Sequence, residues 1–370
     1  MTRSASCGSA VVQEDIERLL ARTSGLWEGL RGSHLFVTGG TGFFGRWLLE
    51  ALVAADRAHG LDLRVTVLSR HPARFADKAP HLARSGIVTT IPGDVRNFVF
   101  PPGPVTHVIH AATEASASLD RDDSATMYDV CAKGTQRVLA LAGENGASRF
   151  LLTSSGAVYG QLPDGMTRAT ERLRRCGEPP LSTSGYADGK REAERLCSEA
   201  GDGGMGITIA RCFAFVGPYL PLDRHFAVGN FIRDAITGGP LDVRGDGTAV
   251  RSYLYAADLV EWLVTILLHG RPGRAYNVGS ETGVTIGELA RCVAMVAGGL
   301  QSTGSPTVQL AGMPTSGTAP DHYLPDCSRA RDELGLREST PLEEAIRRTI
   351  RHVLDKTASS DTATANGQGA

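Results

Sequence analysis

The chain has 370 residues, enough for one large domain or two smaller ones with a substantial buried core. Hydrophobic residues make up 42% and charged residues 21%, and the net charge of -2 gives no general support for binding nucleic acid or a membrane. The seven cysteines are odd in number and form no CxxC pair, which argues against a disulfide framework or a zinc site. The sequence therefore predicts a cytoplasmic protein without a bound metal.

In chain order, a helical pattern comes first and apolar β-type runs then alternate with helical patterns. Residues 12–30 are expected to form a helix within an N-terminal extension, 1–30, whose role is packing or a dimer contact. The expected strands are 34–37, 64–68, 87–91, 105–110, 149–153 and 206–212, and the expected helices are 44–55, 124–143 and 186–199. This alternation is typical of a parallel sheet covered on both faces, a doubly wound α/β fold over residues 31–212.

The second half of the chain is less regular. Glycine- and proline-rich segments separate short elements, and Thr285 and Glu288 have the spacing of a capping box before a helix. We expect residues 213–355 to form mainly a smaller α/β lobe that binds substrate, with 161–181 also contributing to the pocket. Residues 356–370 are polar and small, which predicts a disordered tail.

A glycine-rich loop joins the first strand to the next helix. Gly39, Gly42 and Gly45 permit a tight turn, and together with Phe43 and Phe44, where the helix begins, they are the expected cofactor contacts. Free N–H groups at a helix N-terminus attract phosphate, so the loop predicts a dinucleotide cofactor. The spacing GxxGxxG differs by one residue from the commonest fingerprint, and a purely structural turn is the alternative.

The end of the second strand indicates which dinucleotide is bound. NAD sites usually carry an acidic residue there for the ribose, whereas this chain has Ser69 and Arg70, with Arg74 close behind. Ser69 and Arg70 would bind a 2′-phosphate that an acidic residue would repel. We therefore expect NADP(H), the alternative being that both arginines are solvated surface charges.

Other cofactor contacts are expected at the ends of the next two strands. Asp94 and Val95 follow the third strand, where Asp94 would meet the adenine edge or, equally, cap a turn. Ala111 and Ala112 end the fourth strand, where small side chains would let the nicotinamide approach. The preceding His110 is interpreted as a core histidine rather than a catalyst.

The candidate catalytic residues are Ser155, Tyr186 and Lys190. Ser155 lies at the end of the fifth strand, and Tyr186 and Lys190 share one helix face because they are four residues apart. A nearby ammonium and an oxidised nicotinamide would favour the phenolate, lower the phenol pKa from about 10 and let Tyr186 exchange a proton with a substrate oxygen. Ser155 would hydrogen-bond that oxygen, and Lys190 would also contact the cofactor.

These residues together resemble the extended short-chain dehydrogenase/reductase family, which includes nucleotide-sugar epimerases and dehydratases. The resemblance spans roughly residues 33–350 and includes Gly217-Pro218 and the segment 245–253 around Arg251. It implies that a nucleoside-diphosphate sugar is the substrate and that Arg251 contacts its diphosphate, although a surface ion pair would also explain Arg251. It further implies a homodimer and a sugar pocket lined by 161–181 and 218–230.

Departures from the family pattern narrow the expected chemistry. Dehydratases of the family have an Asp-Glu pair where this chain has Gly156 and Ala157, so we disfavour a dehydratase. Cys131 replaces a family asparagine, which puts a proton relay through bound water in doubt, and Ala214 replaces a sugar-contacting asparagine. The second diphosphate arginine expected near Ser316 is absent, so the substrate contacts differ from those of UDP-galactose epimerases.

Three functions remain open on the sequence. The leading hypothesis is NADPH-dependent reduction of the C4 keto group of a dTDP-4-keto-6-deoxyhexose in deoxysugar biosynthesis, for antibiotics or surface polysaccharides, which rests on family analogy. The alternative is a nucleotide-sugar 4-epimerase with a retained NAD(P). A non-catalytic NADP-sensing protein is disfavoured because Tyr186 and Lys190 are both present.

Overall fold

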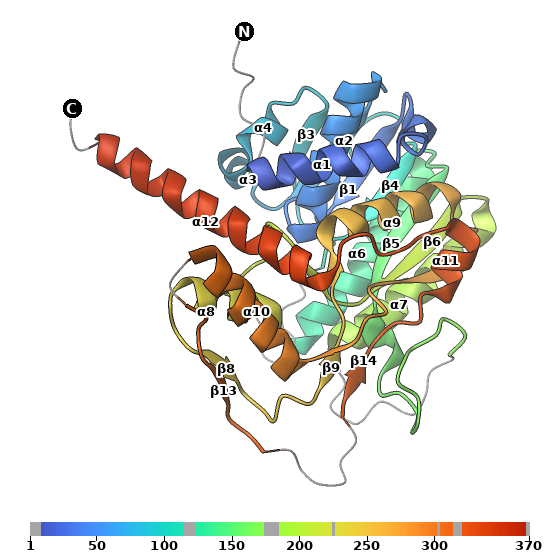
Figure 1. Ribbon diagram of the computed structural model, residues 1–370. Helices are drawn as coiled ribbons and strands as arrows, with labels where there is room; N and C mark the ends of the chain where they lie inside the picture. The colour runs from blue at the N-terminus through green and yellow to red at the C-terminus, as the bar shows by residue number, and fades with distance from the viewer. Residues whose placement is uncertain are drawn as a thin grey trace.

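A computed structural model of the chain describes residues 9–113, 123–173, 185–223, 226–301, 304–313 and 320–367. Figure 1 shows two regions, a large sheet flanked by helices and a smaller group of helices and short strands at one end of that sheet. Part of the segment 161–181 and the position of Ser316 lie outside the described residues.

The helices and strands follow in chain order. The elements of the first half are α1 (Ala10–Arg22), η1 (Trp27–Leu30), β1 (His34–Thr38), α2 (Phe43–His59), β2 (Arg64–Ser69), α3 (Pro72–Lys78), α4 (Pro80–Ala83), β3 (Val88–Pro92), β4 (His107–His110), α6 (Ser124–Glu144), β5 (Arg149–Ser155) and η2 (Gly156–Tyr159). Those of the second half are α7 (Gly185–Ala200), η3 (Gly201–Gly203), β6 (Gly206–Cys212), β7 (Phe215–Val216), α8 (Ala227–Ile236), β8 (Leu241–Val243), β9 (Val250–Arg251), β10 (Leu254–Tyr255), α9 (Ala256–His269), β11 (Ala275–Val278), β12 (Val284–Thr285), α10 (Ile286–Gln301), β13 (Val308–Leu310), β14 (His322–Tyr323), α11 (Ser328–Leu334) and α12 (Leu342–Gly367).

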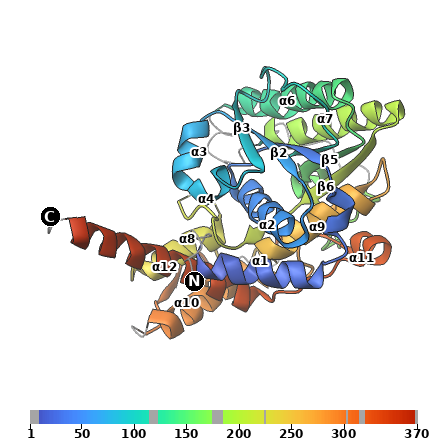
Figure 2. The same cartoon turned by 90° about the horizontal axis from the view of Figure 1, so that it is seen from above.

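The predicted parallel sheet is confirmed. Within the described residues it has seven strands in the order β11-β6-β5-β4-β1-β2-β3, and every neighbouring pair is parallel. The strands are apolar because both faces are covered, and all five residues of β1 are buried. Helices α6 and α7 lie on one face, and α2 and α9 lie on the other (Figure 2). Strand order reverses between β1 and β4, the place where such sheets bind nucleotides.

Residues beyond the expected boundary at 212 also contribute to the large sheet and its cover. Strand β11 comes from the second half of the chain and pairs with β6 at the sheet edge. Helix α9 contributes Leu259, Leu263 and Ile266 to the buried core that it shares with the sheet strands. The sequence prediction missed this because β11 is only four residues long and its apolar run is interrupted by Asn277.

The N-terminal extension is folded onto the body, but not as one helix. Helix α1 ends at Arg22, and the separate turn η1 begins at Trp27, because Ser24 and Gly25 interrupt the helical pattern. Trp27 is fully buried, and its indole N–H donates to Thr23 Oγ1 at 2.9 Å. The packing role expected for this segment is therefore what the structure shows.

The residues expected to form a disordered tail are helical in the structure as far as Gly367. Helix α12 continues through Gly367 and extends away from the body in Figure 1. Neither proline nor glycine occurs between residues 356 and 366, so the sequence contains no strong signal to end the helix earlier. Composition indicated a lack of core-forming residues, which does not by itself exclude a helix.

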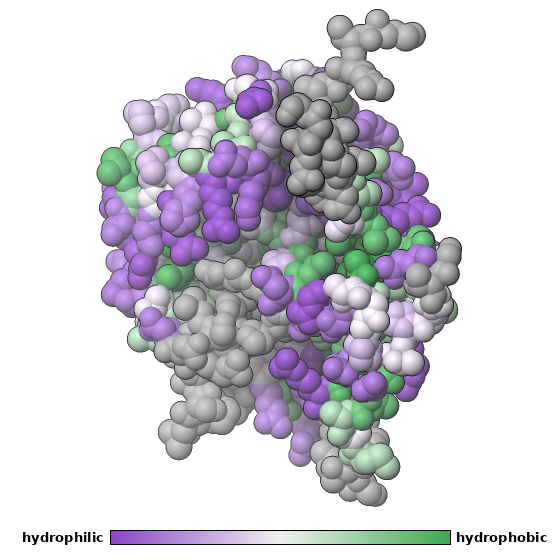
Figure 3. Space-filling model, turned by 90° about the vertical axis from the view of Figure 1, so that its left-hand side faces the viewer, coloured by the Kyte–Doolittle hydropathy of each residue, from purple (hydrophilic) through white to green (hydrophobic). Residues whose placement is uncertain are grey.

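On the face shown in Figure 3, hydrophilic residues surround smaller hydrophobic areas. In the described parts of the chain, no helix is both long enough and apolar enough to cross a membrane.

Candidate active site

The glycine loop lies between β1 and α2 at the point where strand order reverses. Gly39 has a positive φ of 71°, and a Cβ atom there would stand 2.3 Å from the carbonyl oxygen of Ala111. A Cβ at Gly45 would stand 2.2 Å from Gly40 Cα. These two glycines are required by close backbone packing, which brings the loop against the end of β4.

Gly42 differs from the other two glycines because the space beside it is open. It precedes the first residue of α2, and a Cβ there would meet only the Gly39 carbonyl oxygen, at 3.4 Å. The open side lies at the helix N-terminus, where N–H groups attract a pyrophosphate. Phe43 and Phe44 supply the first helical N–H groups, while the Phe44 ring packs edge-on against Phe215 at 5.0 Å. The loop therefore fits the dinucleotide expected from the sequence.

The residues expected to select the cofactor lie at the end of β2. Ser69 is buried, and its hydroxyl accepts a hydrogen bond from the His71 amide at 3.2 Å. Arg70 is exposed, and its positive charge contributes to lowering the pKa of Asp94. The positive charge of Arg70 therefore interacts with the Asp94 carboxylate at this end of the sheet.

Asp94 takes the turn-capping role that was one of its two expected roles. Its carboxylate accepts two bonds from the Arg96 guanidinium, at 2.8 and 2.9 Å, and one from the Arg96 amide at 3.0 Å. The contact with Arg96 is the main reason why the pKa of Asp94 is lowered. Val95 is buried and lies against Gly134 of α6. An adenine contact by either residue stays a prediction.

The end of β4 connects the glycine loop to the candidate catalytic lysine. The amides of Ala111 and Ala112 both donate to Thr38 Oγ1 at 3.1 Å. The next residue, Thr113, accepts a hydrogen bond from the Lys190 ammonium at 3.0 Å. Thr113 was not selected on the sequence, although a polar residue directly after the end of a strand was a usable signal.

His110 is a core histidine, as expected. Its ring contacts the hydroxyls of Thr38 at 2.7 Å and Thr135 at 3.0 Å. Burial lowers its pKa to about 3, so the ring is neutral at physiological pH.

Ser155, Tyr186 and Lys190 are brought together by the packing of α7 on α6 and β5. A Cβ at Gly189 would stand 2.7 Å from Cys131 Cβ on α6, so glycine at that position lets the two helices approach closely. Lys190 is buried and donates to the Thr153 carbonyl oxygen at 2.7 Å. Its ammonium lies 5.8 Å from the centre of the Tyr186 ring, and the Tyr186 phenol has Ser155 as a hydrogen-bonding partner.

In the protein alone, burial governs the electrostatics of the phenol; the lowering expected from the ammonium together with a bound oxidised nicotinamide stays a prediction. Burial is the largest influence on Tyr186 and raises its pKa above the ordinary phenol value, while the contact with Ser155 acts in the opposite direction. Burial also lowers the pKa of Lys190, because an ammonium loses hydration in the interior. In the protein alone, Tyr186 is therefore a neutral proton donor rather than a phenolate.

This shift sets the pH dependence that a reduction would have if Tyr186 supplied its proton. The protonated phenol would be the donor, so activity would be retained below its folded-state pKa and lost as the pH rises through it. We expect Tyr186 to impose no loss of reduction rate up to the ordinary phenol pKa of about 10. Initial rates measured from neutral pH upward check this, with circular dichroism at each pH as the control for folding. A Tyr186-dependent loss centred near neutrality would contradict it.

Arg251 lies in the second region, on β9, and is engaged within the chain. Its guanidinium pairs with the Asp321 carboxylate at 2.7 Å and also donates to the Asp321 carbonyl oxygen at 3.0 Å. Strands β9 and β14 are parallel neighbours, with Arg251 opposite Tyr323. The ion pair that was the alternative explanation for Arg251 is present, and a diphosphate contact stays a prediction.

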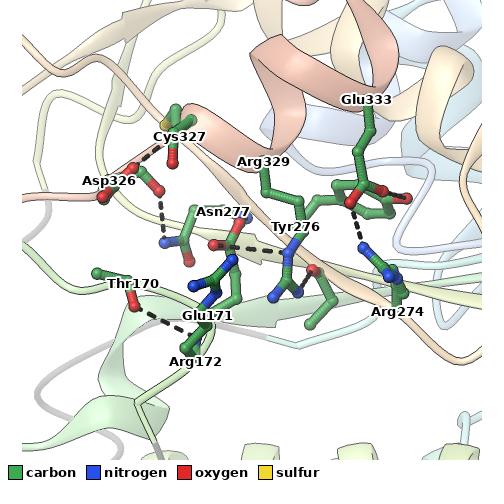
Figure 4. Close-up of polar contacts among 12 residues, drawn as sticks. Thr170, Glu171, Arg172, Arg274, Tyr276, Asn277, Asp326, Cys327, Arg329 and Glu333 are labelled. Atoms are coloured by element: carbon green, nitrogen blue, oxygen red, sulfur yellow. Dashed lines mark hydrogen bonds and ion pairs between the residues drawn. The ribbon is translucent and has the colours of Figure 1, made fainter.

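Asn277 of edge strand β11 holds the segments around the site in place. Its side-chain amide donates to the carbonyl oxygens of Ala169 at 2.8 Å and Asp326 at 2.9 Å, and its oxygen accepts from the Tyr159 hydroxyl at 2.7 Å. The Glu171 carboxylate accepts from the Asn277 backbone amide at 2.8 Å (Figure 4). One buried residue thus joins η2, the middle of the predicted sugar-pocket segment 161–181 and the segment between β14 and α11.

The fold and this arrangement define a Rossmann-type protein with a dinucleotide loop and a tyrosine–lysine pair at the same edge of the sheet. The chain belongs to the NAD dependent epimerase/dehydratase family, whose model matches residues 35–279.

Individual relatives carry different activities. The chain is 30% identical over 325 residues to UDP-glucuronic acid decarboxylase 1 of Arabidopsis thaliana, covering 87% of this chain and 70% of that protein. It is 25% identical over 340 residues to a dTDP-glucose 4,6-dehydratase of Streptomyces niveus, covering 88% and 94% of the two chains.

Solved structures agree on the fold. The crystal structure of a Streptomyces venezuelae dTDP-glucose 4,6-dehydratase with NAD and TYD bound has a TM-score of 0.73 and 26% identity, covering 87% of this chain and 97% of that one. A UDP-glucose 4-epimerase from Thermotoga maritima has a TM-score of 0.72, covers 88% and 99% of the two chains, and at 20% identity shows the fold alone.

Proposed function

We propose that the protein reduces the C4 keto group of a nucleotide-activated 4-keto-6-deoxyhexose, with NADPH as the reductant and a dTDP sugar as the expected substrate. The observation that carries the proposal is the neutral, buried Tyr186 phenol beside Ser155, at the same sheet edge as the glycine loop. As a member of its family the chain is a nucleotide-sugar-modifying enzyme. The particular reaction is inferred from what the site contains.

Each residue has a defined task in this reaction. The cofactor supplies a hydride when bound, and the glycine loop with the N-terminus of α2 would hold its pyrophosphate. Ser155 binds the keto oxygen and orients it, and Tyr186 gives that oxygen the proton that turns it into a hydroxyl. Lys190, held by Thr113 and Thr153, places a positive charge beside the phenol as it loses its proton.

The turn after Ser155 supports a reductase over a dehydratase. Elimination needs an acid and a base beside the reacting carbons, and Gly156 and Ala157 supply neither. At Gly156 a side chain is also excluded, since a Cβ would stand 2.7 Å from the Tyr323 hydroxyl and 2.8 Å from the Phe213 ring. The neighbouring residues therefore fill the space that an acidic side chain at 156 would need.

A product assay tests the proposal. Purified protein is incubated with dTDP-4-keto-6-deoxyglucose and either NADPH or NADH, and nicotinamide absorbance and the sugar product are followed. We expect stoichiometric oxidation of NADPH and a C4 hydroxyl in the product. Unchanged nicotinamide absorbance with this and other 4-keto sugar nucleotides would rule the reductase out.

A nucleotide-sugar 4-epimerase is the second candidate, because the same three residues suffice for it and it too needs no acid at 156 or 157. An epimerase oxidises and re-reduces one carbon with a retained cofactor, so it shows no net consumption of nicotinamide. UDP-glucose and UDP-glucuronic acid incubated with NAD⁺ form the comparison arms of the same assay. Formation of an epimerised sugar, or release of carbon dioxide from the uronic acid, would contradict the reductase assignment and identify the activity instead.

The cofactor preference is predicted to depend on Arg70. Replacing Arg70 with Asp removes a charged donor and places a negative charge where the 2′-phosphate would lie, so the NADPH:NADH preference should fall by about tenfold or more. Cofactor dissociation constants measured by fluorescence titration check this without any substrate. Arg57→Asp, an exposed arginine in the last turn of α2, is the matched control, and an unchanged preference in Arg70→Asp contradicts the NADP(H) assignment.

We also propose a homodimer in which α6 and α7 pack across a two-fold axis. These two helices pack on each other and cover one sheet face in Figure 2, and Tyr128 of α6 exposes 38% of its surface. Sedimentation equilibrium gives the mass that tests this.

A further inference from the structure

A largely buried ion pair lies one helical turn beyond the candidate catalytic lysine. Glu194 follows Lys190 by four residues on α7, so the two side chains share one face of the helix. Its partner, Arg211, lies on β6 directly beside Ser154 of β5 in the parallel register. The side chains of Glu194 and Arg211 expose only 13% and 16% of their surface. Neither residue was selected on the sequence.

The Glu194 carboxylate binds both of these neighbouring strands. Its Oε1 accepts from the Ser154 hydroxyl at 2.5 Å and from Arg211 Nε at 3.0 Å. Its Oε2 accepts from Arg211 Nη2 at 2.6 Å. The two bonds from the guanidinium make a bidentate pair, which fixes the relative orientation of the two groups. Because Ser154 directly precedes Ser155, the carboxylate ties α7 to the residue beside the candidate catalytic serine.

Two successive turns of α7 are thus bonded to two successive residues of β5. Lys190 donates to the Thr153 carbonyl oxygen at 2.7 Å, and one turn later Glu194 accepts from Ser154. A helix held at two points on one face cannot slide along the strand or rotate about its axis without breaking one of these bonds. Tyr186 lies one turn before Lys190, so these contacts also set the position of the phenol relative to β5.

Arg211 is held from its other side as well. Its Nη1 donates to the Tyr159 hydroxyl at 3.1 Å, and its guanidinium lies 4.9 Å from the centre of the Tyr159 ring. The Tyr159 hydroxyl donates in turn to Asn277 Oδ1 at 2.7 Å. Burial raises the pKa of Tyr159 to about 12, so the hydroxyl keeps the proton that this bond needs. The guanidinium therefore cannot turn away from Glu194 without losing its contact with η2.

Stability alone does not account for an ion pair at this place. Burying two charges costs hydration, and apolar side chains of similar volume often replace a buried pair without loss of stability. Apolar side chains would not supply the directional bonds that join α7 to β5 and β6. The pair is therefore suited to fixing the orientation of the helix.

We propose that Glu194 and Arg211 are positioning residues that hold α7 on β5 and β6 in the register that the candidate catalytic residues need. The proposal rests on the roles given to Tyr186 and Lys190 in the proposed function, but not on which reaction they perform. The pair would act through α7, so its loss should lower the rate of the chemical step and leave cofactor affinity nearly unchanged.

The double variant Glu194→Leu/Arg211→Met tests this role. It removes both charges together, so no buried charge is left unpaired and the Tm should stay close to that of the wild type. We expect kcat to fall by about tenfold or more, because a small misplacement of catalytic groups has a large effect on rate. The dissociation constant for NADPH should change less than twofold. A wild-type kcat in the folded double variant would overturn the proposal.

Ser154→Ala is a milder variant that removes only the bond from the strand to Glu194. It should lower kcat in the same direction at a wild-type Tm, and a wild-type kcat in this variant would also overturn the proposal. In the double variant Ser154 has no carboxylate to bind, so adding Ser154→Ala there should cause no further loss of kcat. Losses that multiply would show that the serine and the pair act separately, against the proposal.

The ion pair between Arg274 and Glu333 is the matched control (Figure 4). It too includes a tyrosine hydroxyl, since Tyr276 donates to Glu333 at 2.9 Å, but it joins β11 to α11 and has no bond to α7. The variant Arg274→Met/Glu333→Leu should keep the wild-type kcat. A loss as large as that in Glu194→Leu/Arg211→Met would show a general effect of removing charges and would refute the positioning role.

A measurement without substrate separates this proposal from the proposed function. In protein labelled with ¹³C at tyrosine Cζ, the Tyr186 resonance is assigned by its absence in Tyr186→Phe. We expect it to shift in Glu194→Leu/Arg211→Met, because the phenol moves relative to the Lys190 ammonium, and to stay unchanged in the control pair. This shift in a protein that reduces no 4-keto sugar would refute the reductase and support the positioning pair, whereas an unmoved resonance would refute the pair.

Discussion

Replacing Tyr186 with Phe is expected to abolish most of the activity while leaving the fold intact. The phenol is the proton donor of the proposed reduction, and proton transfer by a positioned side chain typically contributes about 10²–10⁴-fold to the rate. The phenyl ring preserves the packing of α7 on α6, so Tm should change little. Single-turnover rates with excess enzyme check this, since they report the chemical step without product release.

The control for this prediction is cofactor affinity. Tyr186→Phe should bind NADPH with a dissociation constant close to that of the wild type, because Lys190 keeps its bonds to Thr113 and Thr153. A variant that retained more than a tenth of the wild-type rate would show that another group supplies the proton. That result would refute the proposed mechanism, and only the assignment of a nucleotide-binding fold would stand.

The glycine loop offers the second large effect, in which two neighbouring substitutions should fail for different reasons. Gly45→Ala places a Cβ 2.2 Å from Gly40 Cα, a backbone contact that cannot yield by rotating a side chain. It should destabilise the protein by about 1–3 kcal/mol or more, as overpacking does. Gly42→Ala meets only one atom, at 3.4 Å, and should keep the wild-type stability.

Gly42→Ala, which should leave stability unchanged, is expected to weaken cofactor binding. The added methyl group stands on the open side of the loop where the pyrophosphate would approach, so NADPH affinity should fall by about tenfold or more. Urea unfolding and fluorescence titration, performed on both variants, distinguish the two effects. Full NADPH affinity in a stable Gly42→Ala protein would place the pyrophosphate elsewhere.

The agreement between sequence and structure is closest where local patterns carry the information. Strand β6 has the expected bounds, α6 is one residue longer than expected at its C-terminal end, and α7 is one residue longer at each end. The capping box at Thr285 is present, since Glu288 accepts from the Thr285 amide at 2.9 Å and donates its own amide to Thr285 Oγ1 at 3.1 Å. Such features depend on residues a few positions apart, which a sequence displays directly.

The candidate site was predicted in its members but not in its electrostatics. The spacing of Tyr186 and Lys190 follows from one helix, so their shared face needed no tertiary information. The direction of the Tyr186 pKa shift did need it. An ammonium and an oxidised nicotinamide were expected to lower that pKa, whereas in the protein alone burial by surrounding elements raises it.

Residues contributed by the second region escaped prediction for a related reason. Strand β11 completes the sheet with only four residues, and Tyr323 reaches the turn at Gly156 from a two-residue strand. Neither has a periodicity that a window of sequence could reveal, because so short a strand is stabilised by its partners rather than by its own pattern.

The order of strands and helices, the glycine loop and the tyrosine–lysine pair were all present in the chain as local patterns of hydrophobicity and spacing. The state of the phenol, the partners of Arg251 and Asp94, and the place of Tyr323 depended on which distant segments met. Burial and hydrogen bonding are properties of an environment, and for these residues the environment exists only after β5, α7, β9 and β14 have come together.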